Sequence, residues 1–271
     1  MNDRTPFSEH EAEQDADPGR APDPGVIGGD ERAGVARRTQ SLGRWLWEWT
    51  KSIFIALLLF LFVRTFMVEA FQIPTASMEN TLLVGDFLLV NKMVYGAEIP
   101  GTHLQLPGFD EPSRGEVVVF EPPPSAGQAP HTNYVKRIVG VPGDTLQMRA
   151  GRLTVNGSPL DEPYVKEIRR AGDLPSGQFA WQRAYLVRWP RGRPYTPTRD
   201  TWGPIYVPDD SFFVMGDNRA NSEDSRYWGY VPKEAIKGRP MIIYYSYDRR
   251  QPAPWPWLTE IRWDRILHGI R

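Results

Sequence analysis

The feature that most limits how this chain can fold is one apolar segment near its beginning. Residues 52–63 carry no charge over twelve positions, and three tryptophans lie in 45–49 just before them. A helix needs ~20 apolar residues to cross a bilayer, but Lys51 and Arg64 can extend their charged ends toward the headgroups, and residues 66–68 prolong the apolar run. Because tryptophan favours the membrane interface, this pattern predicts one membrane-spanning helix.

We place this helix at residues 45–69. Four basic side chains lie between residues 37 and 51, so the preceding end is expected in the cytoplasm and the following part outside it. Two alternatives remain open from the sequence. One is a signal peptide cleaved near Val68-Glu69-Ala70, although the preceding tail is very long for one. The other is a buried core helix, since charge-free runs of this length also occur in cores.

The two flanks of this helix differ in composition. Residues 1–44 are rich in Pro, Gly, Asp, Glu, Ala and Arg and contain one aromatic residue, Phe7, so we expect a disordered cytoplasmic tail. Residues 70–271 contain short apolar runs separated by Pro and Gly, which predict a mostly β extracytoplasmic domain of antiparallel sheet. A smaller β subdomain is expected as an insertion at about 151–206, where the sequence is rich in Pro and Arg.

Several stretches of this domain have the composition of strands, because they are rich in β-branched and aromatic residues. Asn156-Gly157 is a hairpin turn signal after Arg152–Val155, and residues 233–236 are expected to form one helical turn. Further strands are expected over residues 86–91, 115–120, 133–141, 211–216 and 241–247.

The composition of the chain and the spacing of its residues exclude several kinds of functional site. The chain has no cysteine, which excludes disulfides, thiolate metal sites and a cysteine nucleophile. The formal net charge is -1, so no bulk attraction to nucleic acid is expected. No two of the four histidines (His10, His103, His131 and His268) have helix-ligand spacing, and no phosphate-binding or dinucleotide-binding glycine motif occurs. We therefore expect no metal or cofactor and look to serine and lysine.

Ser77 and Lys136 are the candidates for such chemistry. Ser77 follows Pro74, which restricts the residue before it to extended geometry, and Thr75 offers a second hydroxyl nearby. Lys136 shares one face of a predicted strand with Tyr134. Burial there would lower the lysine pKa and make the amine a general base. An edge-strand lysine that prevents aggregation is the alternative interpretation.

A third polar stretch, residues 216–229, follows a predicted apolar strand. It is dense in Asp, Asn, Ser and Arg, and Asp224 and Arg226 could pair bidentately. A plain polar loop remains the alternative, and a calcium loop would need more acidic side chains at alternate positions.

These stretches together resemble the type I signal peptidases of bacteria, which are membrane-anchored Ser-Lys peptidases. Ile73-Pro-Thr-Ala-Ser77-Met78 resembles the family's nucleophile box, and Gly85–Gly96 resembles the box that follows it. Tyr134–Asp144 resembles the box with the general-base lysine, and Gly216–Gly229 the last box. The order of the boxes and the upstream anchor agree with the family.

The resemblance implies a role for each matching residue in a catalytic domain at 70–271. Ser77 would be the nucleophile, Lys136 the base and Thr75 the side-chain oxyanion donor. Ser222 would hydrogen-bond the lysine amine. Supporting roles would fall to Arg137, Asp217, Asp224 and Arg226. Shallow pockets for small side chains would be lined by Phe71, Ile73, Met78, Leu82, Tyr134 and Val135.

The implied function is cleavage of signal peptides from exported preproteins, by a single-pass protein of the bacterial cytoplasmic membrane with its catalytic domain outside. The implied partners are preprotein signal peptides, the lipid bilayer and the export machinery, but not nucleic acid. Two residues depart from the family pattern: Asn80 stands where proline is common, and Ala220 where the last box often has Asp. Trp255, Trp257 and Trp263 are either a second interfacial patch or ordinary packing residues.

Two other functions remain open from the sequence. A specialised Ser-Lys processing peptidase of the pilin or conjugation type would share the same chemistry. A self-cleaving repressor would too, but it would need a DNA-binding domain upstream. A membrane-tethered β-rich binding protein without activity belongs to a different class, and replacement of Ser77 or Lys136 would distinguish it.

Overall fold

The computed structural model describes residues 42–96, 102, 106–129, 132–166, 172–190, 192–252 and 254–270. Most of the expected disordered tail, residues 1–41, lies outside these ranges, as do His103 and His131. Helix α1 (Leu42–Phe62) continues into a π-helical turn, Val63–Met67. The chain divides into two units within this helix, between Trp49 and Thr50.

The apolar helix is long enough to cross a membrane. Gly43–Met67 comprises 25 residues with a mean hydropathy of 1.8 in its most apolar window, and none of that window is buried. Exposed apolar side chains throughout are not those of a buried core helix, so that alternative is not supported. The helix ends at Met67 rather than residue 69, because Val68 and Glu69 pair with the next strand.

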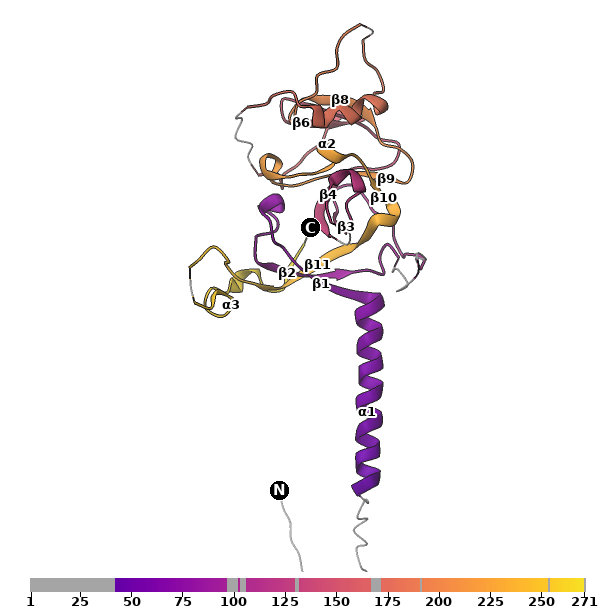
Figure 1. Cartoon of the computed structure of the whole chain (residues 1–271), viewed down its shortest axis with the longest axis vertical. Helices are drawn as coiled ribbons and strands as arrows, with labels where there is room; N and C mark the ends of the chain where they lie inside the picture. Colours follow the sequence, from indigo (N-terminus) through magenta and orange to yellow (C-terminus); the bar gives the residue numbers. More distant parts are fainter. Residues whose placement is uncertain are drawn as a thin grey trace, which may run out of the picture. The chain divides into compact units, whose positions relative to one another are not determined.

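The domain that follows contains two antiparallel sheets, so the expected mostly β, antiparallel fold is confirmed. In the larger sheet the strand order is β1-β2-β11-β3-β4-β9-β10, and β12 pairs with β11. Figure 1 shows β11, which comes late in the chain, beside β2 and β3 from its first half. The strands of the larger sheet are β1 (Val68–Gln72), β2 (Asp86–Asn91), β3 (Val117–Phe120), β4 (Tyr134–Gly140), β9 (Ser211–Met215), β10 (Val231–Pro232), β11 (Ile236–Ser246) and β12 (His268–Gly269).

The smaller sheet corresponds to the expected insertion but begins earlier. Its order is β7-β6-β5-β8, and β5 precedes the expected boundary at residue 151 because it pairs with both β6 and β8. Asn156 and Gly157 both have positive φ, as a two-residue hairpin turn between β6 and β7 requires. The strands are β5 (Thr145–Arg149), β6 (Arg152–Val155), β7 (Ser158–Pro159) and β8 (Trp202–Tyr206).

The helical pieces of the domain are short. The helical turn expected at 233–236 is present as a 3₁₀ turn. The short α-helices are α2 (Ser225–Trp228) and α3 (Pro256–Thr259), and the 3₁₀ turns are Ala76–Met78, Pro124–Ala126, Gly177–Tyr185, Arg219–Asn221, Lys233–Ala235 and Trp263–Arg265.

Separate parts of the core hold the segments that build the site. In one cluster Met78 and Leu82 pack with Leu88 of β2, which fixes the turn after Pro74. In another, the smaller sheet packs through Leu146 against Phe213 of β9, so the two sheets share apolar contacts. Burying a side chain of this size contributes roughly 1.5–3 kcal/mol. The polar segments that follow β1 and β9 are therefore attached to well-packed strands.

Candidate active site

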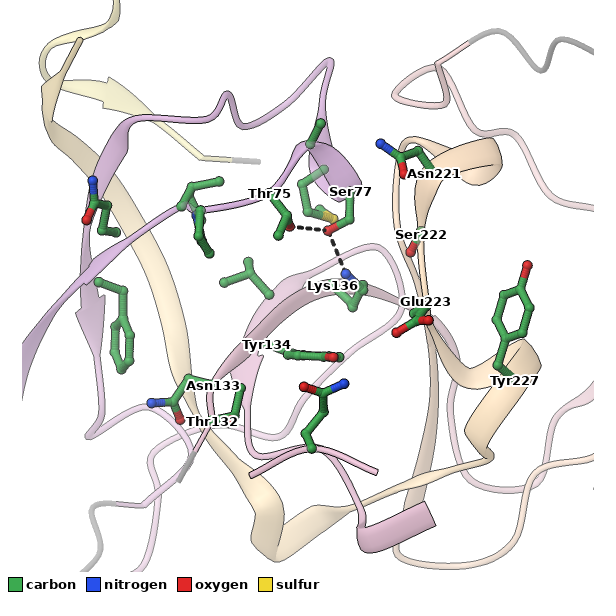
Figure 2. A pocket seen from close by; sticks show the side chains of 18 of the residues that line it. Thr75, Ser77, Thr132, Asn133, Tyr134, Lys136, Asn221, Ser222, Glu223 and Tyr227 are labelled. Atoms are coloured by element: carbon green, nitrogen blue, oxygen red, sulfur yellow. Dashed lines mark hydrogen bonds between the residues drawn. The ribbon is translucent and has the colours of Figure 1, made fainter. Parts of the chain in front are cut away.

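Ser77 lies in a tight turn that two buried side chains anchor. Ala76–Met78 form one 3₁₀ turn, and the Leu82 backbone N–H donates to the Met78 carbonyl at 2.8 Å. Because the side chains of Met78 and Leu82 are fully buried, this turn cannot shift without opening the core. The Ser77 side chain points toward the neighbouring strand β4 (Figure 2).

Lys136, in the first half of β4, meets Ser77 directly. Its Nζ lies 2.6 Å from Ser77 Oγ, although the two residues are 59 apart in the sequence. Thr75 Oγ1 lies 3.4 Å from the same oxygen (Figure 2). Lys136 is only 4 % exposed, whereas a lysine on a solvated strand edge would be hydrated. This geometry is the one that a Ser-Lys pair requires.

Burial changes the protonation of this amine. It lowers the pKa of Lys136 from 10.5 to about 8, against the opposing charge of Asp224, which raises it. At pH 7 about one lysine in ten would then be neutral. Nζ also lies 5.3 Å from the centre of the Tyr134 ring, as expected for two residues on one face of a strand.

Arg137 and Asp217 join β4, the strand that carries Lys136, to the polar segment at residues 216–229, here called the last polar loop. Arg137 Nε and Nη2 donate to the two carboxylate oxygens of Asp217 at 2.9 and 2.7 Å, and both side chains are almost completely buried. Thr81 Oγ1 donates to the same carboxylate at 2.6 Å. Asp217 therefore connects β4 to the segment that follows Ser77.

Asp224 and Arg226 form the predicted bidentate pair. Arg226 Nε and Nη2 donate to Asp224 at 2.8 Å each, and both side chains are fully buried. Burial by itself would raise the pKa of Asp224, but the charge and hydrogen bonds of Arg226 outweigh it and lower the pKa. Asp224 also caps α2 by accepting the Arg226 N–H.

Ser222 departs from its expected contact. In the described residues no hydrogen bond joins its hydroxyl to Lys136, and the hydroxyl instead lies close enough to Asp224 to help lower the pKa of that carboxyl. The lysine amine points at Ser77 instead, and Ser222 is engaged through its backbone carbonyl, which accepts from Arg226 at 3.4 Å. Ser222 nevertheless lines the same pocket.

A strap from the insertion, Glu162–Lys166, contacts all the segments that build the site. The Tyr164 ring lies 3.9 Å from the Arg137 guanidinium, and the Tyr164 carbonyl accepts from Asn80 Nδ2 at 3.0 Å. The Lys166 N–H donates to the Asp217 carbonyl at 2.9 Å. The inserted subdomain therefore supports the serine turn, the lysine strand and the last loop together.

Asn80 has a backbone conformation that proline cannot adopt. Its φ is 110°, whereas proline is fixed near −65°. The turn in this chain therefore has a backbone conformation that requires a residue other than the proline common in the family. The Asn80 side chain adds a hydrogen bond to the strap, which a proline ring could not form.

An open pocket of about 570 Å³ surrounds Ser77 and Lys136. Of the residues expected to bind substrate, five line it and Leu82 does not. Leu82 is fully buried in the core, where it packs with Met78 rather than facing the pocket. The lining includes Phe71, Ile73, Thr75, Ser77, Met78, Tyr134, Val135, Lys136, Ser222, Glu223 and Tyr227.

Some residues of the site were not assigned from the sequence. Asn218 donates its N–H to the Ser77 carbonyl at 3.0 Å and its Nδ2 to the Ala76 carbonyl at 3.1 Å. Its position between Asp217 and Arg219, in the last box of the family, was the sequence feature that could have identified Asn218 as a residue of the site. Glu223 lies in the same box, whereas Tyr164 carried no such signal, because its contacts depend on how distant segments pack.

A serine hydroxyl at hydrogen-bond distance from a buried amine with a lowered pKa can attack a carbonyl without a histidine. On an antiparallel β body, this pair is the kind of site that a serine hydrolase with a lysine base would use.

Residues 46–245 match the family model described as "Signal peptidase, peptidase S26". The chain therefore belongs to the signal peptidase family, peptidase S26, and is a membrane-anchored serine peptidase. It is 39% identical over 215 residues to signal peptidase I of Pseudomonas aeruginosa, covering 74% of this chain and 72% of that one. It is 36% identical to signal peptidase I of Leptolyngbya laminosa (75% and 82% covered) and 33% identical to that of Aquifex aeolicus (72% and 82%).

Proposed function

We propose that Ser77 and Lys136 are the nucleophile and general base with which this chain cleaves signal peptides from exported preproteins. The observation that carries the proposal is the 2.6 Å contact between Ser77 Oγ and a lysine amine that is almost completely buried. Family membership supports the substrate class, and the contact supports the residue roles.

The first half of the reaction forms an ester on Ser77. With the amine neutral, the Ser77 hydroxyl donates to Lys136 Nζ, which takes its proton as Oγ attacks the scissile carbonyl carbon. The tetrahedral intermediate collapses, the C–N bond breaks, and Lys136 returns the proton to the leaving nitrogen. In the second half, Lys136 accepts a proton from water as the water oxygen attacks the ester carbonyl carbon; the bond from that carbon to Ser77 Oγ then breaks, Lys136 returns the proton to Oγ, and the signal peptide leaves with a new carboxyl group.

Two donors would stabilise the charge that develops on the carbonyl oxygen. Thr75 Oγ1 lies 3.4 Å from Ser77 Oγ, and the Ser77 backbone N–H belongs to the same turn. Loss of one donor of this kind costs about 10²–10³ in rate. Thr75→Val, which keeps the shape and removes the hydroxyl, is expected to lower kcat by that factor.

The pocket walls fit small, uncharged substrate side chains. Phe71, Ile73 and Val135 provide apolar surface beside Ser77 in the pocket of about 570 Å³. Apolar contacts of this kind favour residues such as alanine before the cut.

The membrane location is part of the proposal. The 25-residue apolar helix would cross the cytoplasmic membrane of a bacterium once, with the catalytic domain outside, near the export machinery. Trp255, Trp257 and Trp263 are 62, 55 and 74 % exposed, and surface tryptophans of this kind favour a lipid interface. Since the chain has no cysteine, single introduced cysteines can test this location. An impermeant maleimide should label Asp209→Cys but not Thr5→Cys on intact cells.

The roles of the two residues can be tested with purified protein and a labelled preprotein. Ser77→Ala and Lys136→Ala should abolish cleavage while melting temperatures change little, and His131→Ala should retain activity. An inactive His131→Ala with an active Lys136→Ala would refute the assignment. Mapping the cut distinguishes a general signal peptidase from a specialised processing enzyme, which would leave ordinary preproteins intact.

A further inference from the structure

Glu223 is a charged residue in the pocket whose carboxylate pairs with none of the residues that the structure describes. It lies between Ser222 and Asp224, both buried, but its own side chain is exposed and lines the pocket. Asp224 is committed to Arg226, whereas Glu223 forms no hydrogen bond or ion pair with the residues that the structure describes. Among the described residues that line the pocket, only Lys136 and Glu223 carry ionisable acid or base groups other than tyrosine.

Figure 2 shows the Glu223 carboxylate near Lys136, across the pocket from the segment that carries Thr75. The last polar loop, with Asn221 and Ser222, forms this side of the pocket. The pocket therefore has one side with apolar and hydroxyl groups and another side with a negative charge.

The proposed reaction determines which part of a preprotein meets this charge. The carbonyl oxygen turns toward Thr75, while the leaving nitrogen must come within hydrogen-bond distance of Lys136 Nζ to receive its proton. The chain that follows the cut bond is therefore directed past Lys136 toward the last polar loop. These are the first residues of the mature protein.

We propose that Glu223 determines charge specificity on the leaving-group side of the pocket, favouring preproteins with a basic residue among the first two after the cut and disfavouring acidic ones there. The proposal rests on the roles proposed for Ser77 and Lys136. The physical basis is Coulombic: an exposed carboxylate attracts a nearby ammonium or guanidinium and repels a carboxylate, and salt weakens both effects.

The expected effect is modest because Glu223 is exposed. Exposed charge pairs change an equilibrium or rate by roughly two- to fivefold. Attraction of a basic substrate and repulsion of an acidic one act in opposite directions. The ratio of kcat/KM for the two substrates should therefore change by roughly three- to tenfold on removal of the charge.

The experiment uses the full-length protein in detergent and three preproteins that differ only in the second residue after the cut, which is Ser, Lys or Glu. The wild type should cleave the Lys substrate faster than the Glu substrate at low salt. Glu223→Gln should bring the ratio of kcat/KM for the Lys and Glu substrates close to the ratio that the wild type shows at high salt, where the charge is screened. Glu223→Lys should invert the ratio. Asp209→Asn removes an exposed carboxylate outside the pocket and should leave the ratio unchanged.

The ratio separates specificity from an effect on the base. The Glu223 charge also raises the pKa of Lys136, but that effect multiplies the rates of all three substrates equally and cancels in the ratio. An unchanged ratio in Glu223→Lys would overturn the proposal, as would an equal loss for every substrate in Glu223→Gln. Failure of the wild type to cleave any of the three would contradict the proposed function instead.

Discussion

Gly216 lies at the point where the last polar loop meets the serine turn, and a single added methyl group should disable the enzyme. A Cβ at this position would overlap Ser222 Oγ, and it would lie 2.6 Å from Ser222 Cβ and 2.5 Å from the Ser77 carbonyl oxygen. The first contact could be relieved by rotating a hydroxyl. The contact with the Ser77 backbone could not, because the same oxygen accepts the Asn218 N–H.

The size of the effect follows from these distances. Non-bonded heavy atoms are comfortable at about 3.5–4.0 Å, so Ser77 and the loop would have to separate by about 1 Å in Gly216→Ala. A displacement of that size at reacting atoms costs about 10²-fold in rate. Overpacking of a tight site also costs about 1–3 kcal/mol of stability. We therefore expect kcat to fall by about two orders of magnitude, with KM nearly constant because the apolar pocket wall is untouched.

Steady-state cleavage of a labelled preprotein, together with thermal unfolding, measures both effects. Gly177→Ala is the matched control, since nothing lies within 4 Å of an added Cβ there and its φ is not positive. This control should keep full activity. A Gly216→Ala enzyme within threefold of wild-type kcat, with an intact fold, would show that Ser77 does not depend on the close approach of this loop.

Three further perturbations test the supporting structure. The logarithm of kcat/KM should rise with pH up to about 8 and then level off, because only the neutral form of Lys136 is a base and burial lowers its pKa; a limb near the ordinary ~10.4 would contradict this. Asp217→Ala leaves the Arg137 charge buried without its carboxylate, so chemical denaturation should show a loss of about 3–5 kcal/mol in unfolding free energy. A loss below about 1 kcal/mol would argue against a dependence on this pair. Tyr164→Leu removes the ring from Arg137 and should cost up to about 2 kcal/mol, while Tyr164→Phe keeps the ring and should cost less; equal losses would assign the effect to the hydroxyl.

Local sequence signals located six of the twelve strands that the structure describes. The apolar runs at 86–91 and 211–216 became β2 and β9, and Asn156-Gly157 became the hairpin turn. These signals work because backbone preference and turn geometry act over a few neighbouring residues. No comparable local signal marks β1, whose partner β2 follows only after the serine turn, or β5, which pairs with the distant β8 as well as with the adjacent β6.

The contacts of individual side chains could be predicted from the sequence less well than the strands. Leu82 was expected in the pocket but lies in the core, and Ser222 was expected on the lysine amine but has no such bond. In both cases the residue type suited the expectation, but the direction of the side chain depended on packing from other strands. The contact between Tyr164 and Arg137 depends in the same way on where the insertion folds back.

The amino-acid sequence by itself determined the apolar helix, the β-rich body and the set of polar residues that chemistry could use, because these follow from composition and short-range spacing. The tertiary structure alone decided that Lys136 is buried and touches a serine 59 residues away. The physical reason is that the protonation of an amine depends on how much water its surroundings exclude. Here those surroundings come from β4, the serine turn and the last polar loop, which meet only when the sheet is formed.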